Sequence, residues 1–310
     1  MFRPSLSLSL PALVLAGVLA SPAALAVQRV FVASFGNDSN TANNCSFANP
    51  CRGFAAAMTM VDYGGEIVAL DAAGYGAVTI DRSVTITANP GFYAGISAAT
   101  GDAITIATPS VQVVLRGLNI NGIGAANGIS MTDGSRLAIE NCVISNFAVA
   151  GVLVNAPATV AIVNSLIREN SYGALIQQHS ASTISNTQFL GNLQVGLKLF
   201  NHTIAGTQST ASVTDSVMSG GQVGIHVAAA MGGMARMPVI RTTLSNLQTG
   251  ALVSESGGMS LLTISNSMVT GNNYGFSMSG SQATVESLGN NTVRQNNVDT
   301  DTPLTAVSTM

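Results

Sequence analysis

The sequence predicts an all-β fold, a right-handed parallel β-helix (solenoid) with a short N-terminal capping helix. The first observation is an internal repeat, in which a glycine opens the last of three short apolar segments every 22 to 28 residues. The second is that apolar residues alternate after each glycine with the period of two that β-strands have. The third is the repeat length, since helical repeats need roughly 30–45 residues and a period near 3.6. The recurring glycines are Gly128, Gly151, Gly173, Gly196, Gly224, Gly250 and Gly275.

A repeat of this length accommodates three short strands in each coil of the solenoid. Successive coils then stack, so that equivalent residues form ladders about 4.8 Å apart. Crossover connections between parallel strands are right-handed in almost all proteins, which sets the expected hand.

Residues 1–26 are expected to be a signal peptide. Arg3 precedes the apolar run LSLPALVLAGVLA, and the segment ALA at 24–26 has the form of a cleavage site. The apolar run is short for a transmembrane helix. The processed chain is therefore expected to begin near Val27 and to be exported, to the periplasm or the extracellular medium.

Residues 27–64 are expected to form an N-terminal cap. The segment CSFANPC places Cys45 and Cys51 in a short loop, which predicts a local disulfide in an oxidising compartment. A metal site is the alternative, but no second cysteine pair completes it. The segment CRGFAAAMTMVDYGG follows, and its Phe54, Met58 and Val61 lie on one face of a short helix that would cover the first coil.

Residues 65–300 are expected to form the coils, and residues 301–310 a C-terminal tail. Two segments, NHTIAGTQST and AAAMGGMARM, read as loops that bulge from otherwise regular coils. One turn position carries an amide or carboxylate in successive coils, which predicts a structural ladder of side-chain hydrogen bonds. Cys142 follows the first of these residues and is expected to be a small buried group rather than a catalytic thiol. The ladder residues are Asn141, Asn164, Asn186, Asp215 and Asn266.

Composition excludes several classes of partner. Only 8% of residues are charged, the formal net charge is −3, and 47% are hydrophobic. The chain therefore folds, but it has no basic run to bind nucleic acid or anionic lipid. No segment after the leader is long and apolar enough to span a membrane, and no motif indicates a cofactor.

The chain resembles the right-handed parallel β-helix proteins of the pectate-lyase-like superfamily. It is most similar to exported bacterial β-helix repeat proteins of uncharacterised function. The similarity rests on the N-terminal stretch VFVASFGNDSN…CSFANPCRGFAAAM…GGEIVALDAAGYGAVTIDRSVTITA and on the coil repeat NSxIxxNxxxG. It covers essentially residues 28–300 and implies the fold, but members of this superfamily include lyases, hydrolases, esterases, adhesins and proteins without known catalysis.

The catalytic signatures of the enzymatic members are missing. Polygalacturonase-like hydrolases carry N-T-D, D-D, G-H-G and R-I-K motifs, whereas this sequence has NTQ at 186–188, GIHV at 224–227, and neither D-D nor R-I-K. Glycoside hydrolysis needs two carboxylates across the scissile bond, and Asp215 and Glu169 are only loose candidates. Calcium needs six to eight oxygen ligands, and no coil supplies a cluster of carboxylates.

The rarest ionisable groups of the chain are expected to gather on one outward face. Lys198 is the only lysine, and the three histidines lie in neighbouring coils, His179 and His202 at one strand position and His226 at another. The histidines cannot share one zinc ion, because His226 would lie roughly 13 Å along the strand direction from the other two. We call the outward residues the histidine–lysine stripe: Leu175, Gln177, His179, Lys198, Phe200, His202 and His226.

The favoured function is non-catalytic binding of polysaccharide or cell-surface material along this stripe, with Phe200 as an apolar platform and polar neighbours as hydrogen-bond donors. Three alternatives stay open: a divergent polysaccharide lyase or glycoside hydrolase, a structural or adhesin-like scaffold without a defined ligand, and a stripe of unrelated solvated side chains. The sequence predicts no metal site, and it leaves the oligomeric state open.

Overall fold

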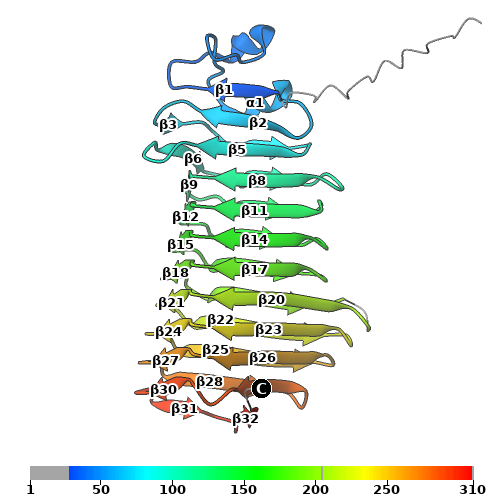
Figure 1. The fold of residues 1–310 in the computed structure, drawn as a ribbon, viewed down its shortest axis with the longest axis vertical. Coiled ribbons are helices and arrows are strands. Elements are labelled where there is room, and N and C mark those ends of the chain that lie inside the picture. The colour runs from blue at the N-terminus through cyan, green and yellow to red at the C-terminus, as the bar shows by residue number, and fades with distance from the viewer. Residues whose placement is uncertain (1–27, 204, 309–310) are drawn as a thin grey trace, which may run out of the picture.

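A computed structural model describes residues 28–203 and 205–308, and the predicted signal peptide lies outside these residues. The described chain winds through three parallel sheets, which we name A, B and C, and each coil adds one strand to each of them. Figure 1 shows the strands of sheet A stacked in chain order from β1 to β32. The predicted parallel β-helix is confirmed.

Sheet A has 12 strands among the described residues. They are β1 (Arg29–Val32), β2 (Gly65–Ala69), β5 (Val84–Ala88), β8 (Gln112–Arg116), β11 (Arg136–Glu140), β14 (Thr159–Val163), β17 (Ala181–Ser185), β20 (Gln208–Thr214), β23 (Met234–Ile240), β26 (Met259–Ser265), β29 (Ala283–Ser287) and β32 (Thr305–Ala306).

Sheet B has 10 described strands: β3 (Ala73–Gly74), β6 (Ala94–Ala98), β9 (Leu118–Gly122), β12 (Val143–Ser145), β15 (Leu166–Arg168), β18 (Gln188–Leu190), β21 (Val217–Ser219), β24 (Thr243–Ser245), β27 (Met268–Thr270) and β30 (Thr292–Arg294). Sheet C also has 10: β4 (Val78–Ile80), β7 (Asp102–Ile106), β10 (Asn127–Met131), β13 (Ala150–Val154), β16 (Tyr172–Gln177), β19 (Val195–Asn201), β22 (Val223–Ala230), β25 (Thr249–Ser256), β28 (Tyr274–Ser279) and β31 (Val298–Thr300).

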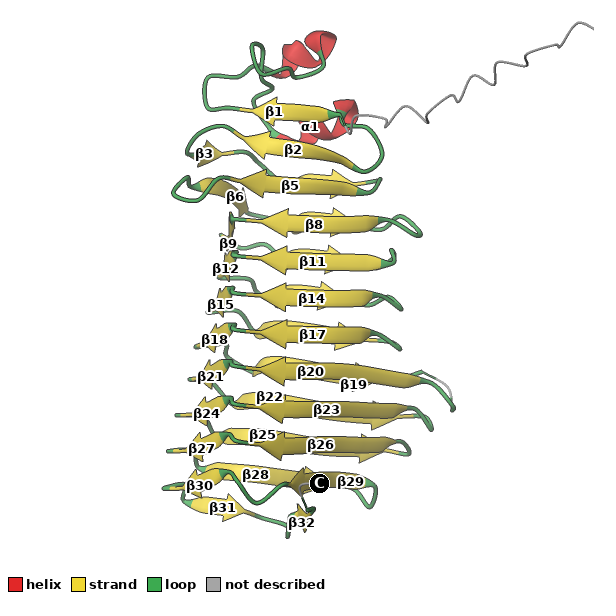
Figure 2. Cartoon of the chain, in the orientation of Figure 1, coloured by secondary structure: helices red, strands yellow, loops and turns green. Residues whose placement is uncertain are grey.

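The N-terminal end holds two short helices, the 3-10 helix η1 (Asp38–Asn43) and α1 (Phe54–Met60), drawn red in Figure 2. Phe54 and Met58 of α1 join the core, and Val61 ends the helix with its side chain buried as well. Cys45 and Cys51 form a disulfide. Strand β1 lies within residues 27–64, the segment expected to form only a cap, and it already pairs with β2. The sheet therefore begins earlier than the sequence suggests.

The recurring glycines lie where each strand of sheet C begins. A Cβ atom at Gly173 would come 2.4 Å from the carbonyl oxygen of Gly196 in the next coil. The same contact repeats up the stack, so only glycine allows the coils to approach this closely. After the glycine, the first and third residues point into the core; Leu197 and Leu199, for example, are fully buried.

The turn between sheets A and B holds each ladder residue in the left-handed conformation that asparagine tolerates best, with φ of 50° at Asn164 and 48° at Asn186. Asn186 Nδ2 donates to Asn164 Oδ1 at 2.9 Å, and Asn164 Nδ2 donates to Asn141 Oδ1. Arg241 occupies the same position at φ 48°, and both its Nε and Nη2 donate to Asp215 at 2.7 Å. The sequence pattern did not identify Arg241 as a member of this ladder.

Cys142 lies beside this turn, inside the core. Burial raises the pKa of its thiol to about 11, so the group is a neutral thiol at neutral pH. Its backbone N–H donates to Ser165 Oγ, and Ser165 donates in turn to the carbonyl of Val163. The thiol therefore packs within the coil instead of facing solvent.

Of the two segments expected to bulge as loops, 228–237 is largely strand, whereas the described residues of 201–210 are strand only at Asn201 and Gln208–Thr210. Strands β19, β20, β22, β23, β25 and β26 have 7 or 8 residues, compared with 5 in most earlier strands of sheets A and C. The inserted residues therefore widen three neighbouring coils at the junction of sheets C and A. Within the described chain no helix combines the length and hydropathy needed to cross a membrane.

Candidate functional site

The outward face of sheet C carries the residues singled out from the sequence. One ladder runs the length of this face, and we call it the central column. It begins with Thr79 and Thr105 near α1 and passes through Lys198 and His226. Its members in order are Thr79, Thr105, Ser130, Leu153, Leu175, Lys198, His226, Leu252 and Ser277.

Lys198 of β19 and His226 of β22 are neighbours in this column, as the repeat predicts. Both side chains are half-buried. Burial lowers the pKa of Lys198, and burial together with the charge of Lys198 lowers the pKa of His226 to about 4. His226 Nε2 lies 2.8 Å from Ser254 Oγ of the following coil. At neutral pH the pair is therefore one cation beside one neutral imidazole.

Three stripe residues form a row along β19. The Lys198 ammonium lies 5.1 Å from the centroid of the Phe200 ring. His202 follows Phe200 two residues later in the chain. The centroids of the two rings lie 5.0 Å apart, and the ring planes are inclined by 30°. Phe200 is therefore held by contacts at both neighbouring positions of its row, which presets the orientation of its ring.

The turn that follows β19 is fixed by Asn201, which is fully buried. Its Nδ2 donates to the carbonyls of Thr207 and Met234 at 3.0 Å, and its Oδ1 accepts from the N–H of Thr203 at 3.1 Å. His202 is the next residue along the chain, so this network positions the backbone that carries the imidazole.

The remaining stripe residues differ in placement. Leu175 pairs with Lys198, and Gln177 with Phe200, so both belong to the same face. His179 does not, because the pairing of β16 with β19 ends at Gln177 and Phe200, and Gln178 turns with φ of 62°. His179 is exposed. Among the described residues, no group of three or more His, Cys, Asp or Glu is placed to share a metal ion.

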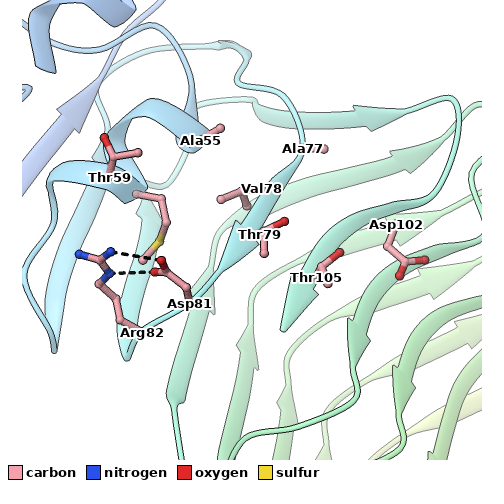
Figure 3. Close-up of a pocket in the computed structure, with 10 residues that line it drawn as sticks. Ala55, Thr59, Ala77, Val78, Thr79, Asp81, Arg82, Asp102 and Thr105 are labelled. Carbon is pink, nitrogen blue, oxygen red and sulfur yellow. Dashed lines mark hydrogen bonds and ion pairs between the residues drawn. The ribbon is translucent and has the colours of Figure 1, made fainter. Parts of the chain in front are cut away.

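A hollow of about 410 Å³ lies at the N-terminal end of the same face. Figure 3 shows α1 on one side of it, with Thr59, and strands β4 and β7 on the other, with Thr79 and Thr105 of the central column. Asp81 pairs with Arg82 at 2.8 Å, which lowers the pKa of the carboxyl group. Asp102 also lines the hollow and accepts a bond from Asn127 at 2.8 Å.

The sequence does not predict this hollow, because its walls come from segments far apart in the chain. One wall is α1, and the other is formed by strands that follow α1 by about 20 to 50 residues. The alternation places Thr79 and Thr105 outward, but nothing in the local pattern predicts that α1 closes this end of the column. The outward face of sheet C thus has a polar hollow at one end and the row of Lys198, Phe200 and His202 further along.

Comparison with known proteins supports the fold. The family model described as "Right handed beta helix region" matches residues 95–298. Among solved structures, the crystal structure of pectate lyase Pel9A aligns with a TM-score of 0.70 and 17% identity, over 90% of this chain and 80% of that one. The full-length tailspike protein 2 of Escherichia coli O157:H7 bacteriophage CAB120 aligns with a TM-score of 0.55 and 14% identity. That alignment covers 76% of this chain and 36% of the tailspike.

These structural alignments, at such low identity, establish the right-handed parallel β-helix and nothing about chemistry. No curated protein matches the chain.

Proposed function

The chain belongs to the right-handed β-helix family, and from that premise we propose that it is an exported protein that binds a polysaccharide chain along the outward face of sheet C without cleaving it. The observation that carries this proposal is the row of Lys198, Phe200 and His202, with His226 beside it in the next coil. The face offers an apolar ring, a cation and two imidazole rings within one short stretch.

The shape of the face suits an elongated ligand. The central column continues over nine strands, and its members repeat about every 4.8 Å. Most of its side chains are uncharged, with hydroxyl groups at both ends and leucines around the row. A polymer with alternating hydroxyl and apolar surfaces can contact several coils at once, so weak contacts add along its length.

Two features favour binding over turnover. No ion pair or hydrogen bond joins Lys198 or His226 to a carboxylate in the described part of the chain, so neither is oriented as a general acid or base. In the hollow near α1, Arg82 keeps Asp81 ionised. A glycosidase acid requires the opposite shift, a raised carboxyl pKa.

Ligand-dependent stabilisation tests the proposal. The melting temperature of the processed protein should rise with at least one member of a panel of neutral and acidic polysaccharides, because a ligand that binds the native state stabilises it. The rise should be lost in Lys198→Ala/His202→Ala and kept in His179→Ala, which removes the histidine outside the row. A rise that survives the double substitution would place the ligand elsewhere.

A further inference from the structure

A second hollow, of about 470 Å³, lies on the outward face of sheet A near its N-terminal end. Phe31, Val68, Thr87 and Arg116 occupy successive positions of one ladder across β1, β2, β5 and β8. Arg29 lines the same hollow from the adjacent ladder. The hollow thus combines an apolar floor with two guanidinium groups and the carboxylate of Glu66, and it lies on a different sheet from the histidine–lysine stripe.

Both guanidinium groups retain free donors. Arg29 donates from Nε to Glu66 at 2.7 Å, and Arg116 donates from Nε to Glu140 at 2.8 Å. No other bond of either guanidinium occurs within residues 28–203 and 205–308, so both Nη groups of each remain available. The side chains are 61% and 45% exposed, which leaves these donors accessible from solvent. Arginine forks of this kind match the geometry of carboxylate and phosphate groups.

The apolar floor is shaped by an aromatic pair. The half-buried Phe31 ring meets the Phe47 ring edge-on, with the centroids 5.5 Å apart. Arg116 also borders a neighbouring hollow of about 400 Å³, whose wall includes Phe92. The large aromatic side chains that the described chain exposes all lie between Phe35 and Tyr93, at this end of the solenoid.

We propose that this hollow binds an acidic saccharide segment, with one oxyanion on Arg29, the same kind of group on Arg116 about 14 Å away across three strand spacings, and one ring face on Phe31. The guanidinium groups supply the charge recognition, and Thr87 and Asn89 in the lining supply polar partners for hydroxyl groups. The ligand class is shared with the proposed function of sheet C, but the site is separate, so either can fail without the other. The oxyanion is a carboxylate or a phosphate group.

Three small probes test the site by isothermal titration calorimetry: glucuronate, glucose 6-phosphate and glucose. At least one acidic probe should bind, and glucose should bind at least tenfold more weakly. Binding of glucuronate alone identifies the group as a carboxylate, and binding of glucose 6-phosphate alone identifies it as a phosphate. Added salt should weaken the interaction, because exposed charges are screened.

The matched variants are Arg29→Gln/Arg116→Gln and, as a control on sheet B, Arg168→Gln, which likewise removes an exposed arginine from an ion pair, here with the adjacent Glu169. The double variant should lose affinity at least tenfold and the control should not. Both should fold, since exposed ion pairs contribute little to stability. Unchanged affinity in the double variant, equal binding of glucose, or no acidic binding at millimolar concentration would overturn the proposal.

A variant on sheet C shows whether the acidic probe binds in this hollow or at the histidine–lysine stripe. Lys198→Ala/His202→Ala should bind the acidic probe as the parent protein does. Loss of binding in that variant, with binding retained in Arg29→Gln/Arg116→Gln, would assign the anion to sheet C and overturn the site on sheet A.

Discussion

Lys198 and His226 are register neighbours on β19 and β22, and no described carboxylate is bonded to either of them. In a chain with few charges, two basic groups thus lie side by side and half-buried on an otherwise uncharged face. Burial favours the neutral form of both groups, and the charge of Lys198 further disfavours the imidazolium form of His226. The pair is suited to donate and accept hydrogen bonds with a neutral ligand, and it carries one positive charge at neutral pH.

The titration of His226 should report this arrangement. Its pKa should lie near 4, because burial disfavours the imidazolium and Lys198 repels it. In Lys198→Met the pKa should rise, but only part of the way to 6.5, since burial is the larger cause. Two-dimensional NMR of the histidine ring signals across pH measures both values. A pKa near 6.5 in the parent protein would contradict the burial and pairing described above.

Stability should fall in acid for the same reason. The pKa of His226 is lower in the folded chain than in the unfolded chain, so the unfolded state binds the proton more readily. The resulting stabilisation is present above about pH 6.5 and is lost as pH falls through about 4, by on the order of 3 kcal/mol. Urea unfolding of the parent and of His226→Gln at both pH values checks this: the variant should lose less stability between them.

The coils approach closely at the recurring glycines, so adding one methyl group there should strongly lower the free energy of unfolding. Gly173→Ala should destabilise the protein by about 3 kcal/mol, because its Cβ would meet a backbone oxygen and the Phe189 ring, neither of which moves freely. Gly74→Ala on β3 is the matched control, since no atom lies within 4 Å of its added Cβ. Denaturant midpoints compare the two, and equal midpoints would contradict the packing argument.

Two substitutions at Asn164 separate the backbone and side-chain contributions of the turn ladder to the free energy of unfolding. Asn164→Ala loses two amide hydrogen bonds and places alanine at φ 50°, so it should cost about 2 kcal/mol. Asn164→Gly loses the same bonds without the conformational penalty, so it should cost about 1 kcal/mol less. Thermal unfolding of both variants measures the difference. Identical losses would mean that the left-handed conformation carries no cost at this turn.

Much of this fold follows from periodicity, because a solenoid repeats its local environment. Alternation after each glycine places Leu197 and Leu199 inward and Lys198 and Phe200 outward, as observed. The sequence pattern did not reveal Arg241 because its side chain differs from asparagine, whereas its left-handed φ and its bonds to Asp215 make it equivalent in the structure. The strand content of segment 228–237 was not expected, and the buried Asn201 amide joins that segment to the preceding coil by donating to the carbonyl of Met234.

The two hollows could not be predicted from the sequence for a different reason. Each is built from segments that come together only through the stacking of coils, such as α1 and β4 in one hollow and β1, β2, β5 and β8 in the other. Their residues are ordinary threonines, arginines and alanines without a motif, so the sequence pattern carries no signal for them. The row of Lys198, Phe200 and His202, by contrast, lies along β19 and the residue that follows it, where a period of two is sufficient to align the three side chains.

The single lysine offers the most direct test of the sheet C face. Reductive methylation with ¹³C-formaldehyde labels Lys198 and the α-amino group, giving two NMR signals, of which the second serves as an internal reference. Titration with the polysaccharide that raises the melting temperature should shift the Lys198 signal saturably and leave the α-amino signal in place. A Lys198 signal that stays unmoved while the melting temperature still rises would show that the polymer binds away from this face.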